Sequence, residues 1–424
     1  MSPPVRILIA LVAGLLVGIW LISTAPDAGA AGLAVAEPVG TMWLHGLQMT
    51  IVPLVVSLLV TGIASTAQAA QASKLAGRAL ALFISLLWVS AALGAAFTLG
   101  LLQLFPLGAD AAGALRAAVA SAGDVGEVPP FADFIVAMVP TNALNAAAND
   151  AFLPLILFAS VFGFAVTRLP EAQRALLVGF FQAVAATMLV VIGWVLWLAP
   201  IGVFALAFTV GAKAGTAAFG ALLHYVAIVT STGFGVALLA IPMALIGARL
   251  SLASYLRAMS QPFAVAVSTQ SSLASLPAML RATERLDVPV ATAGVTLPLA
   301  VAIFRFTGPA MNLSVVLYVA HIFGVELSAA QIAIGIAAAA ITSLGAVSLP
   351  GSISFVSSCA PIALALGLPL GPLGLLVAVE TFPDIMRTLG NVAMDVATTA
   401  TVAKRSGAEQ GPMTEVDAIL DAAP

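Results

Sequence analysis

Residues 371–404 have the sequence GPLGLLVAVETFPDIMRTLGNVAMDVATTATVAK, an apolar segment that carries a row of polar side chains. The row consists of Glu380, Asp384, Arg387, Asn391 and Asp395. Their successive spacings of four, three, four and four would place all of them on one face of a continuous helix. A charged side chain at the centre of a bilayer costs about 2.5–3.5 kcal/mol on insertion scales, so this face must line a protein-lined, hydrated or ion-filled interior. The alternative is an ion-pair ladder of Glu380 and Asp384 with Arg387 that only locks helices together.

The composition of the whole chain places this segment in a membrane. Of the 424 residues, 62% are hydrophobic and 8% are charged, and the mean hydropathy is +1.14. A soluble globular protein carries about 25% charged residues because its surface faces water. A soluble enzyme and a disordered chain are therefore excluded, and the net charge of -3 supplies no basic field for a nucleic acid. The apolar runs at 6–23, 78–105 and 179–212 have helix length, so we expect an all-α integral membrane protein rather than a barrel.

Hydropathy divides the chain into a part with long apolar runs and a part that is apolar but interrupted. We expect helices in the first part near 6–23, 42–66, 78–105, 132–168, 174–212 and 216–248. The first of these is expected to be retained, because the residues that follow it form a poor cleavage site for a signal peptide. A solvated loop is expected at 106–131 and a polar tail at 405–424. The interrupted part runs from about 250 to 404.

Positive charges predict the orientation of the chain, because cytoplasmic loops carry the excess of Lys and Arg. We place both termini in the cytoplasm. The Lys and Arg residues then lie mostly on the cytoplasmic side only if segment 252–283 starts and ends on that side and segment 329–370 starts and ends on the outer side. We therefore expect two re-entrant hairpins, whose broken backbone is tolerated where it lines a cavity. Interrupted segments that enter from opposite faces are typical of inverted repeats around a midplane site. Two spanning helices kinked at Pro277 and Pro350 are the alternative.

The polar row suggests how a charged ligand would bind. Arg387 is suited to a substrate carboxylate, since its planar fork binds that group in a bidentate manner. Asp384, one turn away, could receive an ammonium group. Asp395, deeper along the helix, could ligate a monovalent cation or take up a proton.

Arg305 is a second arginine within an apolar segment, in the sequence IFRFTGP of residues 303–309. Gly308 and Pro309 are expected to break the helix there. Asp395 is the expected partner of Arg305, because an unpaired arginine would be unstable at that depth. Three roles are open for Arg305: it binds a second substrate carboxylate, it takes the place of a coupling cation, or it forms a structural bridge.

No catalytic motif occurs in the sequence. A Walker A loop, a GxSxG elbow and an HExxH helix are absent, and the three histidines have no metal-ligand spacing. We therefore expect a protein that is not an enzyme and has no cofactor, apart from the monovalent cation or proton that Asp395 could bind.

Several motifs resemble the dicarboxylate/amino-acid:cation symporter family over about residues 6–407. DIMRTLGNVAMD (384–395) fits the family pattern D-x-x-R-T-x-x-N-x-x-x-D, and SSLASLP (271–277) is similar to the serine-rich tip of the first family hairpin. SLGAVSLPGS (343–352) is similar to the glycine-rich tip of the second. Scaffold matches are MTIVPLVVSLLVTGIAS (49–65), VPTN (139–142), APIGVFAL (199–206) and TLPL (296–299).

The resemblance implies a fold of eight transmembrane helices plus two re-entrant hairpins, built as inverted repeats. By position it implies scaffold helices 1–2 at 1–77, transport-domain helix 3 with an extracellular loop at 78–131, and scaffold helices 4–5 with transport-domain helix 6 at 132–248. The transport core would follow at 249–404 and consist of hairpin 1, helix 7, hairpin 2 and helix 8. A cytoplasmic tail would occupy 405–424. It further implies a homotrimer, an elevator mechanism and a second hairpin that acts as the outer gate. The expected location is a bacterial-type inner (cytoplasmic) membrane, with both termini cytoplasmic.

The resemblance also implies functional residues by position. Arg387 would hold the distal carboxylate of an acidic amino acid, and Asp384 would hold its amino group. Further contacts to this small anionic substrate would come from Ser271, Ser272, Pro350, Gly351, Thr388 and Asn391. Asn391 and Asp395 would help form a sodium site. Cation or proton coupling would involve Glu380, Asn391, Asp395 and Arg305.

The departures from the family pattern concern the sodium sites. FRFTG (304–308) stands where the family has NMDGT, so an asparagine, a methionine and an aspartate that serve sodium sites are absent. Other lost oxygen ligands align with Ala346, Val89, Ala92 and Leu93. A fixed guanidinium and a sodium ion repel strongly in a low-dielectric site. We therefore predict that Arg305 is a tethered substitute cation paired with Asp395, and that coupling uses protons, fewer sodium ions or no ion.

The leading hypothesis is a secondary active symporter of acidic amino acids, such as aspartate or glutamate, or of small dicarboxylates. Asp384 together with Arg387 favours an amino acid, whereas the extra charge of Arg305 favours a dicarboxylate. The alternative is an uncoupled anion uniporter or channel on the same scaffold. A membrane sensor is a third class, against which the short 405–424 tail argues.

Overall fold

The computed structural model describes residues 3–72, 74–108, 112–113, 139–149, 151–215, 217–344 and 351–406, and these residues contain helices but no strand. The helices of the first half are α1 (Pro3–Thr24), α2 (Pro26–Gln48), α3 (Ile51–Ala72), α4 (Lys74–Leu104), α7 (Ala143–Ala148), α8 (Phe152–Val166), α9 (Glu171–Trp197) and α10 (Ala199–Ala214). Those of the second half are α11 (Ala217–Ala237), α12 (Ala240–Pro242), the π-helical turn η2 (Met243–Gly247), α13 (Leu252–Thr269), α14 (Leu276–Arg285), α15 (Val290–Ile303), α16 (Thr307–Phe323), α17 (Ala329–Ser343), α18 (Gly351–Ala365), α19 (Gly371–Leu376) and α20 (Thr381–Ser406).

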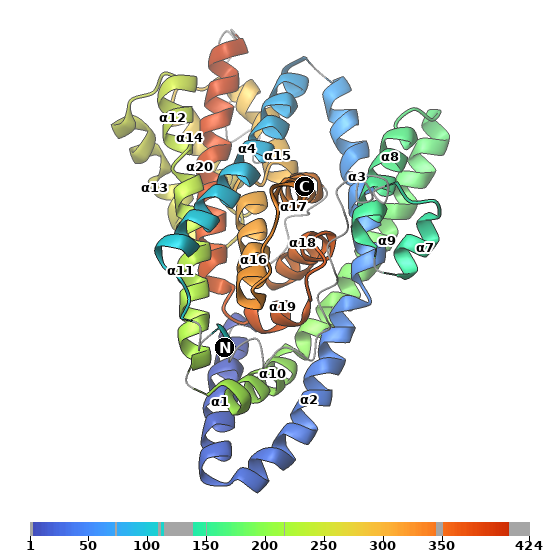
Figure 1. Ribbon diagram of the computed structural model, residues 1–424. Coiled ribbons are helices and arrows are strands. Elements are labelled where there is room, and N and C mark those ends of the chain that lie inside the picture. Colours follow the sequence, from blue (N-terminus) through green and yellow to red (C-terminus); the bar gives the residue numbers. More distant parts are fainter. Residues whose placement is uncertain are drawn as a thin grey trace.

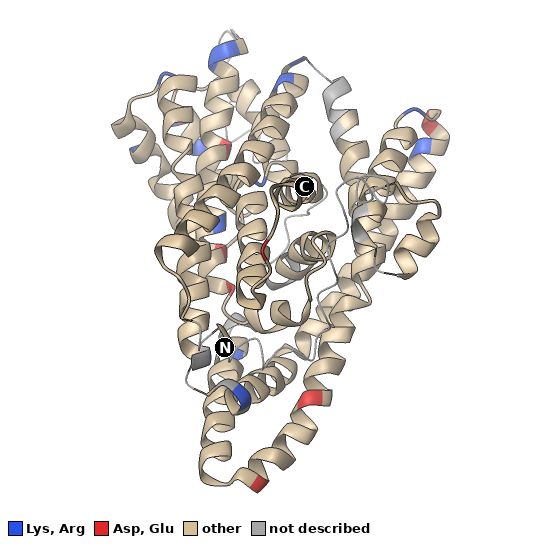
Figure 2. Ribbon diagram, viewed as in Figure 1, with Lys and Arg blue, Asp and Glu red and all other residues tan. Residues whose placement is uncertain are grey.

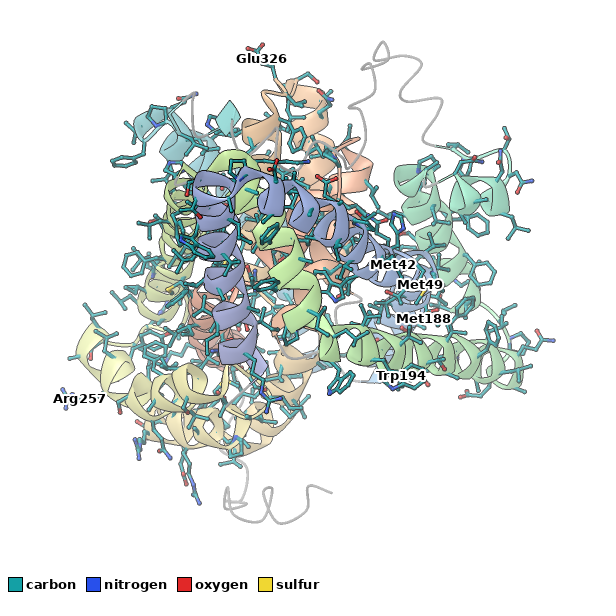
Figure 3. All side chains as sticks on the ribbon, turned by 90° about the horizontal axis from the view of Figure 1, so that it is seen from below. Met42, Met49, Met188, Trp194, Arg257 and Glu326 are labelled. Atoms are coloured by element: carbon teal, nitrogen blue, oxygen red, sulfur yellow. The ribbon has the colours of Figure 1, made fainter. Side chains whose placement is uncertain are left out.

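The described helices have the length and surface of a membrane protein. Six spans among them are long and apolar enough to cross a bilayer: Arg6–Thr24, Pro26–Ser65, Lys74–Leu104, Glu171–Trp197, Phe219–Gly247 and Thr292–Phe323. Large apolar side chains cover the outside of the molecule, among them Met42, which is 72% exposed, and Trp194, which is 67% exposed (Figure 3). Such a surface is stable in lipid and not in water. The expected all-α integral membrane fold is confirmed.

The helices are arranged in two groups (Figure 1). In one group α1 packs along α10, α10 packs on α2, and α3 packs on α8 and α9. In the other, α16 lies against α4 and α11, while α20 lies against α11, α13 and α15. The contact between α4 and α16 is close, because a Cβ atom on Gly94 would stand 2.4 Å from the Cα of Ala310. These packed helices bury α16 along nearly its whole length, so the polar residues of α20 lie in an interior.

The two interrupted segments each form a pair of short helices that pack on one another. The first pair is α13 and α14, where Gln270 adopts a left-handed conformation and the chain turns through 271–275 before Pro277 enters the first turn of α14. The second pair is α17 and α18, whose connection at 345–350 lies outside the described residues. A pair of packed helices is thus present at each of the two expected hairpins. The depth at which each hairpin enters a bilayer stays a prediction.

Several expected boundaries were wrong. A helix over 174–212 was expected, but α9 ends at Trp197 and α10 begins at Ala199, since Pro200 lacks the N–H that a continuous helix would need. The chain before residue 42 is also helical, from Pro26 onward. The expected helix over 216–248 is interrupted by turns and by η2, and the described part of 132–168 is divided between α7 and α8. The expected loop at 106–131 lies mostly outside the described residues.

The last segment is also divided, which corrects the expected continuous helix over 371–404. α19 ends at Leu376, and α20 begins at Thr381. Pro383 cannot donate to a carbonyl one turn earlier, so it fits the first turn of a new helix better than the interior of a long one. Glu380 therefore lies in the turn before α20, although its carbonyl still accepts from the N–H of Asp384 at 2.8 Å.

Candidate functional site

Three charged side chains meet at the start of α20. Nη1 of Arg387 lies 2.5 Å from Oε1 of Glu380 and 2.9 Å from Oδ1 of Asp384. The side chains of Arg387, Glu380 and Asp384 are 3%, 2% and 5% exposed. Figure 2 shows that the charged positions in the interior gather along and beside α20. One nitrogen of the guanidinium is thus held between two buried carboxylates.

The rest of this guanidinium has no hydrogen-bond partner among the described residues. Nε and Nη2 of Arg387 are both buried and unsatisfied, and so is Oδ2 of Asp384. Leaving a buried donor or acceptor unpaired costs about 1–3 kcal/mol, and more when the group is charged. Two free donors on one planar group can be satisfied together by the two oxygens of a carboxylate. The geometry therefore provides a site for an anionic group at Arg387, with a free acceptor of Asp384 on the same stretch of helix.

Tyr225 of α11 holds the far side of Glu380. Its hydroxyl donates to Oε2 of Glu380 at 3.2 Å, and its ring packs edge-on against Tyr318 of α16, with ring centroids 5.3 Å apart. Both tyrosine rings are buried, and the hydroxyl of Tyr318 donates to the carbonyl of Ala221 at 2.9 Å. Glu380 is therefore fixed from one side by α11 and from the other by Arg387.

Thr307 joins the start of α16 to α20. Its N–H and its hydroxyl both donate to Oδ1 of Asn391, at 2.9 and 2.7 Å, and the hydroxyl also lies 2.7 Å from the carbonyl of Arg387. Since a backbone N–H can only donate, the atom of Asn391 that faces it must be the oxygen. The oxygen that the sequence assigned to a sodium site is thus already engaged by two donors.

Arg305 lies in the break between α15 and α16. The backbone of Phe304 leaves the helical conformation there, and its ring stacks on Phe83 of α4 with centroids 4.4 Å apart. The hydroxyl of Ser90 donates to the carbonyl of Phe306, on the other side of Arg305. The charge of Arg305 interacts with those of Asp384, Arg387 and Asp395. The expected helix break is confirmed, and it brings a second guanidinium close to the one on α20.

Asp395 lies one turn beyond Asn391 and is fully buried. Neither of its carboxylate oxygens has a hydrogen-bond partner among the described residues. Its charge interacts with that of Arg305, but no hydrogen bond joins the two side chains. The predicted pairing of Arg305 with Asp395 stays a prediction. The hydroxyl of Tyr255, from α13, donates to the carbonyl of Ala393 at 2.7 Å and fixes this part of α20.

The remaining expected residues occupy several places. The hydroxyl of Thr388 donates to the carbonyl of Asp384 at 3.0 Å, which leaves only its lone pairs for a ligand. Ser271 and Ser272 lie in the turn between α13 and α14, where the Ser271 hydroxyl accepts from the N–H of Ala274 at 3.2 Å. No hydrogen bond links these two serines to α20 within the described part of the chain. Gly351 begins α18, and Pro350 lies outside the described residues.

Thr307, Tyr225 and Tyr255 were not expected at the site. Each comes from a helix far from α20 in the sequence, and no spacing relates any of them to the polar row of α20. The only signal for Thr307 is its place at the start of a helix after Arg305, where a backbone N–H is free to bind a side chain. The sequence therefore indicated the face of α20 but not the side chains that hold it.

Residues 4–405 match the family model described as the sodium:dicarboxylate symporter family. The chain is 28% identical to the proton/glutamate-aspartate symporter of Escherichia coli strain K12, over 94% of this chain and 92% of that protein. It is 26% identical to a C4-dicarboxylate transport protein of Laribacter hongkongensis, over 94% and 88% of the two chains. It is 27% identical to a C4-dicarboxylate transport protein of Bacillus subtilis, over 94% and 92%.

Proposed function

Since the chain belongs to the sodium:dicarboxylate symporter family, whose members are transporters and not enzymes, we propose that it is a secondary active symporter of acidic amino acids or small dicarboxylates. One observation carries the proposal. Arg387 is buried, one of its nitrogens is held by Glu380 and Asp384, and its other two nitrogens have no hydrogen-bond partner among the described residues. A carboxylate satisfies such a fork, and a buried guanidinium gains more from this contact than an exposed one does.

The two substrate classes differ in how they use Asp384. An amino acid such as aspartate or glutamate places its ammonium group at the free Oδ2 of Asp384 and its distal carboxylate at Arg387. A dicarboxylate such as succinate has no ammonium group, and the positive charge of Arg305 compensates its second carboxylate. The names of the relatives include both classes, a glutamate-aspartate symporter and C4-dicarboxylate transport proteins. Ser271, Ser272, Thr388 and the backbone at Pro350 and Gly351 supply further contacts to the substrate in this proposal.

The coupling proposal rests on the charges in the same interior. Glu380, Asp384 and Asp395 are three carboxylates, while Arg305 and Arg387 are two fixed cations, so the described residues leave one formal negative charge. An arriving anion adds to this negative charge, and a proton on Glu380 or Asp395 compensates it. Arg305 supplies permanently a charge that a coupling cation would otherwise bring. Coupling is thus to protons or to a reduced number of sodium ions.

A sodium ion bound by Asn391 and Asp395 is less well supported as the coupling ion than a proton is. Oδ1 of Asn391 already accepts from both donors of Thr307, so sodium would have to displace at least one of them. Asp395 keeps two free oxygens but lies within the field of Arg305, which repels a second cation. A proton needs a single oxygen and no coordination shell, so Asp395 suits it better.

The proposal extends to the movement and the assembly of the protein. The group that contains α20 moves as an elevator against the group that contains α3 and α9, the hairpins enter the bilayer from opposite faces, and three chains form a homotrimer. The membrane is a bacterial-type inner membrane, with both termini in the cytoplasm. These points are supported by the family and by the division of the helices into two packed groups.

Uptake into proteoliposomes tests the proposal. Radiolabelled L-aspartate, L-glutamate and succinate are offered to the purified protein under an imposed proton gradient, and Arg387→Ala serves as the inactive control. Accumulation of one of them above the external concentration, saturable and abolished in Arg387→Ala, is the expected result. Flux that never exceeds equilibrium would identify an uncoupled uniporter or channel and would overturn the symporter. Absence of flux for all three substrates would overturn the substrate class.

A further inference from the structure

A large apolar cavity lies between the two groups of helices. It has a volume of about 720 Å³ and lies between α3 and α9 on one side and α15 with the turn of the first hairpin on the other. Its wall includes Leu58 of α3, Ala186 and Leu189 of α9, Leu273 and Leu276 of the hairpin, and Ala302 of α15. Leu273 is 56% exposed although it lies in a serine-rich turn. An apolar cavity of this size is a poor site for water, which needs polar partners.

A second cavity continues the first toward the start of α9. Its volume is about 260 Å³, and it shares Ser65 of α3 and Gln182 of α9 with the apolar cavity. The lining becomes polar here, with Thr167, Glu171 and Arg174. Arg174 and Glu171 form an ion pair at 3.0 Å, with side chains 28% and 84% exposed. The two cavities are therefore adjacent along α9, and together they have an apolar end and an end that carries one charge of each sign; we treat them as one groove.

The length of this groove matches one leaflet of a bilayer. Arg174 and Leu189 are fifteen positions apart on α9, which corresponds to about 22 Å along a helix. A bilayer measures about 40–45 Å with its headgroups, so a single lipid spans about half of this distance. An acyl chain is apolar and would cover the exposed apolar surface of Leu273, Leu276 and Leu189. A headgroup with a phosphate and a primary ammonium fits the guanidinium of Arg174 and the carboxylate of Glu171.

We propose that this groove binds one phospholipid of the phosphatidylethanolamine type. Its acyl chain occupies the apolar cavity, its phosphate contacts Arg174, and its ammonium contacts Glu171. The lipid lies between the helices that carry the substrate site and those of α3 and α9, so it separates the surfaces that must slide in any movement of one group against the other. None of its lining residues belongs to the cluster around Arg387, although Leu273 follows Ser272 in the turn of the first hairpin.

Native mass spectrometry of the full-length protein tests the lipid site without substrate and without transport. Palmitoyl-oleoyl phosphatidylethanolamine or phosphatidylglycerol is titrated onto the delipidated protein. We expect the protein to retain one phosphatidylethanolamine molecule tightly and to retain phosphatidylglycerol more weakly. Ala186→Phe fills the apolar cavity and should weaken retention about tenfold, whereas Ala183→Phe, on the same helix but outside both cavities, should retain the lipid. Arg174→Gln should weaken it by several-fold, and Arg168→Gln, which lines neither cavity, should not.

Ala302→Phe fills the same cavity from the opposite wall and replaces Ala186→Phe if that variant does not fold. Retention equal to wild type in the cavity-filling variant and in Arg174→Gln would overturn the site. Equal retention of phosphatidylglycerol would overturn the assignment of the headgroup. Failure of the transport assay would leave the lipid result unchanged, because no substrate takes part in it.

Discussion

Asn391 and Thr307 are joined by two hydrogen bonds, since both the N–H and the hydroxyl of Thr307 donate to the same side-chain oxygen of Asn391. The hydroxyl of Thr307 also lies within hydrogen-bond distance of the carbonyl of Arg387. Thr307, at the start of α16, therefore contacts both Arg387 and Asn391 of α20. In the proposed function, Arg387 binds the substrate and Asn391 lies beside the residue that binds the coupling ion. Thr307 also places Arg305, two residues earlier, beside α20.

Thr307→Val tests this connection, because it removes the hydroxyl and keeps the backbone N–H. A neutral hydrogen bond is worth about 1 kcal/mol, so we expect substrate affinity to fall about fivefold in a binding titration. Thr398→Val is the matched control, since Thr398 is buried on α20 but donates only to the carbonyls of Met394 and Asp395 of its own helix. An equal effect of the two substitutions would show that the Thr307 hydroxyl has no specific role.

Arg387→Lys should abolish tight binding even though it keeps the charge. Lysine cannot present two parallel N–H groups to a carboxylate, and each hydrogen bond to a charged group is worth about 1.5–3 kcal/mol. We expect an affinity loss of about thirtyfold or more for every substrate. Arg257→Lys on the exposed face of α13 is the control and should bind as wild type does. Binding by Arg387→Lys at wild-type affinity would mean that the carboxylate lies elsewhere.

Asp384→Asn separates the two substrate classes. The substitution keeps the shape of the side chain but removes the negative charge that an ammonium group needs. Aspartate affinity should fall about tenfold or more, while succinate affinity should be kept or increase, because a repulsive carboxylate is lost. Competition of both compounds in the same preparation supplies the internal control. A parallel loss for both would indicate that Asp384 acts only by holding Arg387.

Gly390→Ala tests the packing of α20 against α16. A Cβ atom at this position would stand 2.4 Å from Cγ2 of Thr307 and 2.9 Å from Cβ of Ala237. We expect a destabilisation of about 1–3 kcal/mol, seen as a lower temperature of thermal unfolding, together with weaker substrate binding. Gly193→Ala on α9 is the control, because its added Cβ would have no neighbour within 4 Å. A Gly390→Ala protein as stable as Gly193→Ala would show that the helices can move apart without cost.

Much of the fold could be predicted from the sequence because its signals are local. The apolar runs indicated the membrane class, the polar row indicated the buried face of α20, and FRFTG indicated the helix break at Arg305. The missed boundaries depend on single prolines inside apolar runs, where hydropathy does not change. Pro200 and Pro383 lie in the first turns of new helices, and the second of these helices starts only after Glu380, which is left in a turn.

The candidate site was predictable only along its own helix. Spacing brought Asp384, Arg387 and Asn391 onto one face, but the partners that fix them come from α11 and α16. Tyr225 reaches Glu380 from 155 positions away, and Thr307 reaches Asn391 from 84 positions away. No spacing rule in a single sequence relates such residues. The pairing of Arg305 with Asp395, which was inferred from charge alone, stays a prediction.

We propose that Arg305 replaces a coupling cation, and the sodium dependence of uptake shows whether it does. Uptake into proteoliposomes is measured under an inward proton gradient, with and without sodium, for the wild type and for Arg305→Met. We predict that the wild type accumulates substrate without sodium, and that Arg305→Met loses uptake about tenfold and regains part of it when sodium is added. If uptake by the wild type depends strictly and cooperatively on sodium, and this dependence is unchanged in Arg305→Met, then Arg305 does not replace a coupling cation.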